Sequence, residues 1–129
     1  MSKEYTEDME LDFGADGRSL IPVVTQDYNT REVLILSFAN KEAFDSTRAS
    51  GFATYWSRSR NELWQKGLTS GDMLKVEEIR INCEQNSLLY LVLPQGRGAC
   101  HAKCGDGTPH TSCYYRRIIK NNKLEFIEK

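Results

Sequence analysis

Short apolar runs alternate with polar turns along most of the chain, and this pattern is typical of a protein built on a β-sheet. The β-branched-rich runs 21–26 and 32–38 are separated by a short polar stretch, which predicts a β-hairpin. The runs 75–83 and 87–93 are arranged in the same way and predict a second hairpin. A further strand is predicted over 52–57.

One helix is predicted between the strands. Asn40 can cap a helix over 41–50 and Gly51 can end it, because asparagine and glycine favour those positions. The elements together predict an α+β fold, a mainly antiparallel sheet with one or two short helices. Residues 1–19 are polar and are predicted to form a flexible lead-in. Dimerisation is one way to cover the exposed edges of so small a sheet.

The composition sets the outer limits of the protein. A length of 129 residues predicts a single domain over 1–129. The formal net charge of −1 gives no reason to expect binding to bulk nucleic acid or to a membrane surface. The acidic first ten residues do not resemble a signal peptide, and no apolar run has the roughly 20 residues of a bilayer span. We therefore predict a cytoplasmic location.

Four cysteines lie in the C-terminal half, three of them between residues 100 and 113. In an exported protein they would suggest two disulfides, whereas in a reducing cytosol such clustering favours metal ligation. A set of small buried side chains is the simpler alternative, and it suits an isolated cysteine better than a cluster beside two histidines.

The segment 56–71 concentrates cationic, hydroxyl and aromatic side chains. Arginine forks, hydroxyls and close-approaching glycine backbone suit phosphate, and the tryptophan faces suit a purine. A solvated loop with its tryptophans in the core is the alternative, and the residue chemistry alone does not separate the two. The candidate binding residues are Trp56, Ser57, Arg58, Ser59, Arg60, Trp64, Lys66, Thr69 and Ser70.

The segment 100–113 carries the metal-binding chemistry. Three thiolate or imidazole ligands plus water would make a catalytic zinc site, at which the pKa of the water falls to about 7. Cys100, Cys104, His110 and Cys113 could instead form a closed structural tetrad, and spacing alone does not decide.

The polar turn 82–86 offers oxygen ligands to a hard cation such as Mg²⁺, although such a sequence is more often a plain hairpin turn.

Together these stretches resemble the phosphoribosyl-AMP cyclohydrolase family over roughly residues 11–117. The resemblance includes the strings Leu-Ile-Pro-Val-Val at 20–24 and Asn-Lys-Glu-Ala at 40–43. Above all it includes 56–71, which is similar to the family's Ser-Arg-Ser-Arg, Leu-Trp, Lys-Gly and Thr-Ser-Gly string.

The resemblance implies an intertwined homodimer with two shared zinc sites. Each zinc takes Cys83 from one chain and Cys100 and Cys113 from the other, and His101 resembles the catalytic histidine. The implied reaction is hydrolysis of the N1–C6 bond of the adenine in phosphoribosyl-AMP, a step of histidine biosynthesis. The nucleotide is the small-molecule partner, held by the hydroxyls and cations of 56–71.

Two departures from the family concern the metals. Asn82, Glu84 and Asn86 stand where the family has three aspartates around the first zinc cysteine, so a Mg²⁺ site should be weak or absent. A longer link between the last two zinc cysteines brings in Cys104 and His110, which could loop out or enter the metal shell.

A divergent paralogue that binds zinc and a purine nucleotide with weak catalysis is therefore the alternative function. A small nucleic-acid-binding zinc module fits less well, because the charge is balanced and paired zinc-knuckle spacings are lacking.

Overall fold

A computed structural model describes residues 2–129 of the chain. Its body is a four-stranded sheet with strand order β2-β1-β6-β5. The α+β class, with mainly antiparallel pairing and one α-helix, is confirmed. The strands of this sheet are β1 (Ile21–Asp27), β2 (Val33–Ala39), β5 (Leu74–Ile81) and β6 (Leu88–Pro94).

Both predicted hairpins are present, and one unpredicted pairing joins them. Strands β1 and β2 are antiparallel neighbours, as are β5 and β6. The join is a parallel pairing of β1 with β6, in which Val23 lies opposite Leu88. Local alternation can predict each hairpin, but it carries no information about which strands of two hairpins meet.

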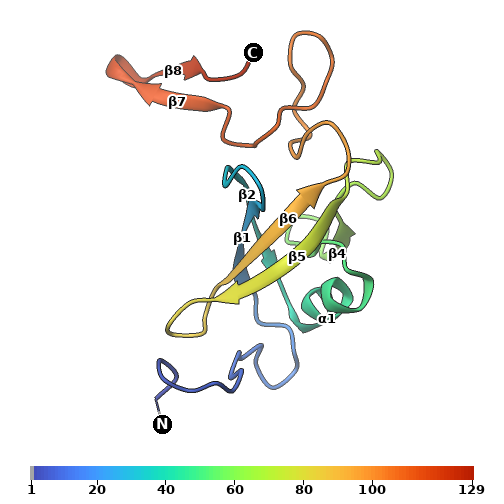
Figure 1. Cartoon of the computed structure of the whole chain (residues 1–129), viewed down its shortest axis with the longest axis vertical. Helices are drawn as coiled ribbons and strands as arrows, with labels where there is room; N and C mark the ends of the chain where they lie inside the picture. The colour runs from blue at the N-terminus through green and yellow to red at the C-terminus, as the bar shows by residue number, and fades with distance from the viewer. Residues whose placement is uncertain (1) are drawn as a thin grey trace.

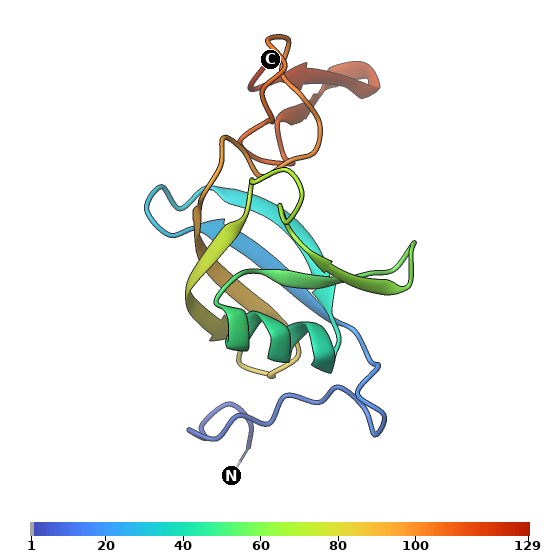
Figure 2. The same ribbon diagram turned by 90° about the vertical axis from the view of Figure 1, so that its right-hand side faces the viewer.

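Helix α1 (Lys41–Ser50) has the predicted bounds and caps. The Asn40 side chain accepts a hydrogen bond from the Ala43 N–H at 2.9 Å, and Gly51 ends the helix in the left-handed region with φ of 82°. The helix buries Ala43, Phe44 and Thr47, which lie on one face because of the helical repeat. That face lies against the sheet (Figures 1 and 2).

The strand predicted over 52–57 is confirmed as β3 (Thr54–Ser57), and it pairs with a second strand, β4 (Glu62–Gln65), that the hydroxyl-rich composition of segment 56–71 did not predict. Strands β3 and β4 form an antiparallel hairpin. It lies beside α1 over one face of the sheet (Figure 2). Tyr55 is fully buried there, and its hydroxyl hydrogen-bonds that of Thr25 at 2.7 Å.

The N-terminal segment contributes to the core, which the polar composition of residues 1–19 did not predict. The ring of Phe13 is 8% exposed and lies 5.6 Å from that of Phe44. The buried Gln85 side chain accepts a hydrogen bond from the Glu10 N–H at 2.6 Å and donates to the carbonyl of Lys3.

The C-terminal arm, residues 99–129, extends away from the sheet (Figures 1 and 2). It contains a long loop and a hairpin of β7 (Arg116–Ile119) and β8 (Lys123–Phe126), joined by a short 3₁₀ turn, η1 (Lys120–Asn122). Every residue of β7 and β8 is exposed. Within the described residues, no helix has both the length and the apolar character needed to cross a bilayer.

Candidate active site

A pocket of about 410 Å³ lies where the C-terminal arm leaves the body. One wall comes from β4 and the loop after it, and the other comes from the two ends of the long loop in the arm. The pocket therefore unites residues of the two segments that the sequence singled out. The predicted site residues that line it are Arg60, Trp64, Lys66, Thr69, Ser70, Cys100, His101 and Cys113.

The body side of the pocket is held by tight backbone packing around Gly67. Gly67 has φ of 80°, and a β-carbon there would clash with the backbone of Asp72 and Met73, so only glycine fits. This fold-back brings the ammonium of Lys66 to 3.3 Å from the Asp72 carbonyl, to which it donates. Lys66 is only 7% exposed, and this burial lowers the pKa of its ammonium.

The arm side is anchored to the sheet edge at β2. The Cys113 N–H donates to the Leu34 carbonyl at 2.8 Å, and the Ser112 hydroxyl donates to the Val33 carbonyl at 2.7 Å. The start of the loop is joined to this anchored end, because the Cys100 N–H donates to the His110 carbonyl at 3.1 Å. Residues thirteen positions apart in the sequence are thereby brought to the same pocket.

The thiols of Cys100 and Cys113 are neighbours. Desolvation, together with a hydrogen bond to the Cys100 thiol, raises the pKa of Cys113 to about 12. Without a metal the Cys113 thiol is therefore protonated at neutral pH. Two adjacent thiols fit zinc, which binds thiolate sulfur and displaces the thiol protons.

The third predicted zinc ligand lies at the other end of the molecule. Cys83 is exposed on the turn before β6, whereas Cys100 follows the far end of β6. The seven residues of β6 span about 20 Å, and the two cysteines lie beyond its opposite ends. Cys83 of the same chain cannot reach the two thiols, so the chain alone supplies only part of the predicted ligand set.

Cys104 and His110 lie apart from this pocket. They face Glu128 instead, and among the described residues the three form a group whose ligand atoms lie within 4.8 Å of one another. Neither Cys100 nor Cys113 belongs to that group. The closed tetrad of Cys100, Cys104, His110 and Cys113, which spacing left open, is therefore not formed.

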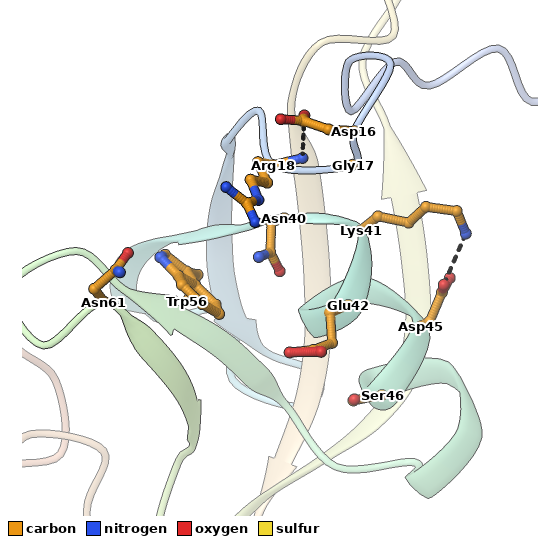
Figure 3. A pocket seen from close by; sticks show the side chains of 10 residues that line it. All are labelled: Asp16, Gly17, Arg18, Asn40, Lys41, Glu42, Asp45, Ser46, Trp56 and Asn61. Atoms are coloured by element: carbon orange, nitrogen blue, oxygen red, sulfur yellow. Dashed lines mark hydrogen bonds and ion pairs between the residues drawn. The ribbon is translucent and has the colours of Figure 1, made fainter.

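Four predicted binding residues lie outside the pocket. Trp56 borders a larger cavity of about 710 Å³ between the start of α1 and the β3–β4 hairpin (Figure 3). The guanidinium of Arg58 stacks on the ring of Phe38 at 4.0 Å from its centroid. The hydroxyls of Ser57 and Ser59 hydrogen-bond each other at 3.4 Å.

The turn 82–86 does not fit a magnesium ion within the chain. The Asn82 amide donates to the side-chain oxygen of Asn86 at 2.6 Å, and its own oxygen accepts from the backbone N–H groups of Asn86 and Ser87. Both amide oxygens are thus engaged, which leaves the exposed Glu84 as the one carboxylate of the three positions.

Two residues of the site were not predicted from the sequence. Asp72 holds the Lys66 ammonium through its carbonyl and accepts from the Arg97 N–H at 3.1 Å through its carboxylate. Lys103 lines the pocket from the arm and adds a cation opposite Lys66. Its place within the cysteine- and histidine-rich segment 100–113 is a signal that could have identified Lys103.

Comparisons with known proteins agree with the sequence resemblance. Residues 35–115 match the family model described as phosphoribosyl-AMP cyclohydrolase. The chain is 53% identical to the phosphoribosyl-AMP cyclohydrolase of Archaeoglobus fulgidus over 85% of this chain and 94% of the relative. It is 46% identical to that of Desulfatibacillum aliphaticivorans over 92% of this chain and 89% of the relative.

A further relative is about twice as long as the part of it that the chain matches. The chain is 42% identical to a histidine biosynthesis bifunctional protein of Aquifex aeolicus over 91% of this chain and 53% of the relative. These matches confirm the family predicted from segment 56–71, and the chain belongs to the phosphoribosyl-AMP cyclohydrolase family of enzymes.

Proposed function

We propose that the chain opens the adenine ring of phosphoribosyl-AMP by zinc-dependent hydrolysis of the N1–C6 bond, in histidine biosynthesis. The observation that carries this proposal is the pocket that joins Cys100, Cys113 and His101 to the cations and hydroxyls of segment 56–71. A metal centre and a phosphate-binding wall facing one cavity are the two parts that hydrolysis of a phosphorylated purine requires.

Cys100 and Cys113 would hold the zinc with Cys83 of a second copy of the chain. When bound, zinc lowers the pKa of its water and so supplies hydroxide at neutral pH. The reach of about 20 Å along β6 favours a second copy as the source of the third thiolate. On this proposal the active unit is a homodimer with two shared sites.

The chain's own side chains bind the nucleotide and move the proton. His101 is exposed in the pocket beside Cys100, where its imidazole can take a proton from the attacking water and deliver it to N1. Arg60, Lys66 and Lys103 supply positive charge for the phosphates, and the face of Trp64 offers a stacking surface for the purine.

The first experiment measures turnover of phosphoribosyl-AMP by the metal-analysed protein, from the change in absorbance on ring opening. Turnover that is lost with zinc chelation and restored by zinc supports the proposal. A folded, zinc-loaded protein without turnover would instead support the divergent paralogue. The separation of Cys104 and His110 from the pocket argues against that alternative, because neither side chain closes the metal's open position.

Mixing two inactive variants tests the shared site. Each proposed site takes Cys83 from one chain and Cys113 from the other. The C83S homodimer and the C113S homodimer each lack a ligand in both sites, so both should be inactive. A mixed dimer keeps one intact site, and random mixing of equal amounts should restore about a quarter of the wild-type turnover. Failure of the mixture to regain any activity, with mixed dimers verified by mass, would contradict the two-chain site.

A further inference from the structure

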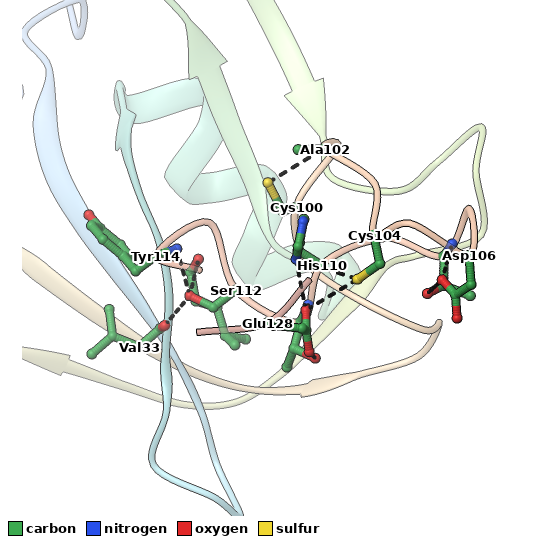
Figure 4. A network of polar contacts seen from close by, with 12 residues as sticks. Val33, Cys100, Ala102, Cys104, Asp106, His110, Ser112, Tyr114 and Glu128 are labelled. Carbon is green, nitrogen blue, oxygen red and sulfur yellow. Dashed lines mark hydrogen bonds and ion pairs between the residues drawn. The ribbon is translucent and has the colours of Figure 1, made fainter. Parts of the chain in front are cut away.

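The loop of the arm and the end of the chain meet at a cluster of three potential metal ligands. The thiol sulfur of Cys104 lies 3.4 Å from Nδ1 of His110 and 3.6 Å from Oε1 of Glu128. His110 Nδ1 and Glu128 Oε1 are 3.0 Å apart. Figure 4 shows the three side chains converging on one point from separate stretches of backbone.

Two of the three separations match the edges of a tetrahedral zinc site, and the third is slightly short. Zinc binds sulfur at about 2.3 Å and nitrogen or oxygen at about 2.0–2.2 Å, so neighbouring ligand atoms around a tetrahedral ion lie about 3.3–3.6 Å apart. The observed distances from the sulfur fall in that range. The nitrogen–oxygen distance needs to open by only a few tenths of an ångström, a small side-chain adjustment.

Two of the three ligands, His110 and Glu128, are oriented by their surroundings before any ion binds. The imidazole of His110 is 2% exposed and stacks on the ring of Tyr115, with centroids 3.7 Å apart and planes within 5°. The carboxylate of Glu128 accepts from the backbone N–H and the hydroxyl of Thr111, both at 2.8 Å. Such outer hydrogen bonds and stacking fix ligand direction in metal sites.

The donor set also fits the ion chemically. One thiolate, one imidazole and one carboxylate suit zinc and related divalent transition metals, whereas Mg²⁺ and Ca²⁺ favour all-oxygen sites. The hydrogen bonds from Thr111 lower the pKa of Glu128, so that its carboxylate is charged at neutral pH. Three protein ligands leave the fourth position to water.

We propose that Cys104, His110 and Glu128 bind a second zinc ion, separate from the one at Cys100 and Cys113. This ion would join the long loop of the arm to the tail that follows β8 (Lys123–Phe126). The loop carries His101 between the two pocket cysteines, so the ion would stabilise the arm side of the pocket. The exposed hairpin of the arm buries little apolar surface that could do so.

The test is a count of bound zinc per chain, by elemental mass spectrometry after dialysis. Wild-type protein should hold about two equivalents, and C104S and E128Q about one each. E125Q is the matched control, because Glu125 is an exposed glutamate of the neighbouring strand β8 and forms an ion pair with Arg117 instead. It should keep the wild-type count.

A second measurement isolates the new site. C113S removes a pocket ligand and should retain about one equivalent of zinc, while C113S/E128Q should retain none. E128Q preserves the shape of a surface side chain, so it serves if C104S does not fold. Equal zinc counts in wild-type, C104S and E128Q proteins would overturn the proposal. The count does not depend on turnover, so failure of the proposed function leaves this test intact.

Discussion

The body and the C-terminal arm of this protein are held together by different forces. The body has one apolar core in which residues such as Val23, Leu34 and Leu74 are fully buried. The arm ends in a hairpin whose apolar side chains face solvent, with Ile118 84% exposed. Burial of apolar surface stabilises the body, and an isolated two-stranded hairpin is marginal in water.

The arm instead relies on polar contacts that converge on a few residues. The Glu128 carboxylate alone accepts hydrogen bonds from the Thr111 backbone and hydroxyl and contacts His110 and Cys104. The pocket lies at the boundary between the two regions. The wall formed by β4 and the loop after it is therefore fixed by the core, while the wall formed by the arm depends on a region that the proposed metal ions or a second chain would stabilise.

The largest loss of turnover is expected from a change in the pocket, where the body and the arm meet. C113A should abolish turnover and remove the pocket zinc, because one of two adjacent thiolates is lost. Ring-opening assays and zinc analysis measure both, with E125Q in the same arm as the control. Near-normal turnover of C113A would show that the cysteines of the arm are not part of the active site.

Replacing His101 tests proton transfer separately from metal binding on the arm side of the pocket. H101N should lower kcat by about 10²–10⁴-fold, the usual contribution of a general acid or base, and leave the zinc content unchanged. Parallel loss of zinc and activity would instead indicate that His101 positions the Cys100 backbone or ligates the metal.

Matched leucine truncations compare the two regions directly. L34A removes a fully buried side chain of β2 and should cost about 2–5 kcal/mol of the free energy of unfolding. L124A removes a side chain of β8 that is 52% exposed and should cost less than about 0.5 kcal/mol. Urea titrations give both values. A cost for L124A near that of L34A would mean that a partner chain covers the hairpin.

A modest gain in stability is expected within the core. Among the described residues the buried hydroxyl of Tyr90 has no hydrogen-bond partner. An unsatisfied buried hydroxyl is costly, so Y90F should raise the free energy of unfolding by about 1 kcal/mol. Thermal unfolding at neutral pH would detect this, and a loss of stability would contradict it.

The same tyrosine predicts a pH dependence. Burial raises the pKa of Tyr90 from 10.0 to about 12. The unfolded chain releases the hydroxyl proton of Tyr90 at a lower pH than the folded chain does. The contribution of this group to the free energy of unfolding is therefore unchanged below pH 10 and declines as the pH rises toward 12. In Y90F the decline over that window should be shallower by about 1.4 kcal/mol per pH unit.

Local sequence signals predicted the elements whose bounds depend on neighbouring residues. The cap at Asn40 and the left-handed Gly51 define α1, and the two polar turns define the two hairpins. The family was also evident from segment 56–71, because its residue types are unusual and contiguous. Strands β7 and β8 were missed because their side chains stay exposed, which leaves no period-2 burial signal.

The sequence by itself determined α1, the two hairpins of the main sheet, the family and the kinds of ligand atom, since these follow from residue type and short-range spacing. The tertiary structure decided which of those atoms meet. It brought Cys100 to Cys113, kept Cys83 at the opposite end of β6, and turned Cys104 and His110 toward Glu128. These choices depend on strand order and on where the long loop is anchored, which are non-local interactions that no short window of sequence encodes.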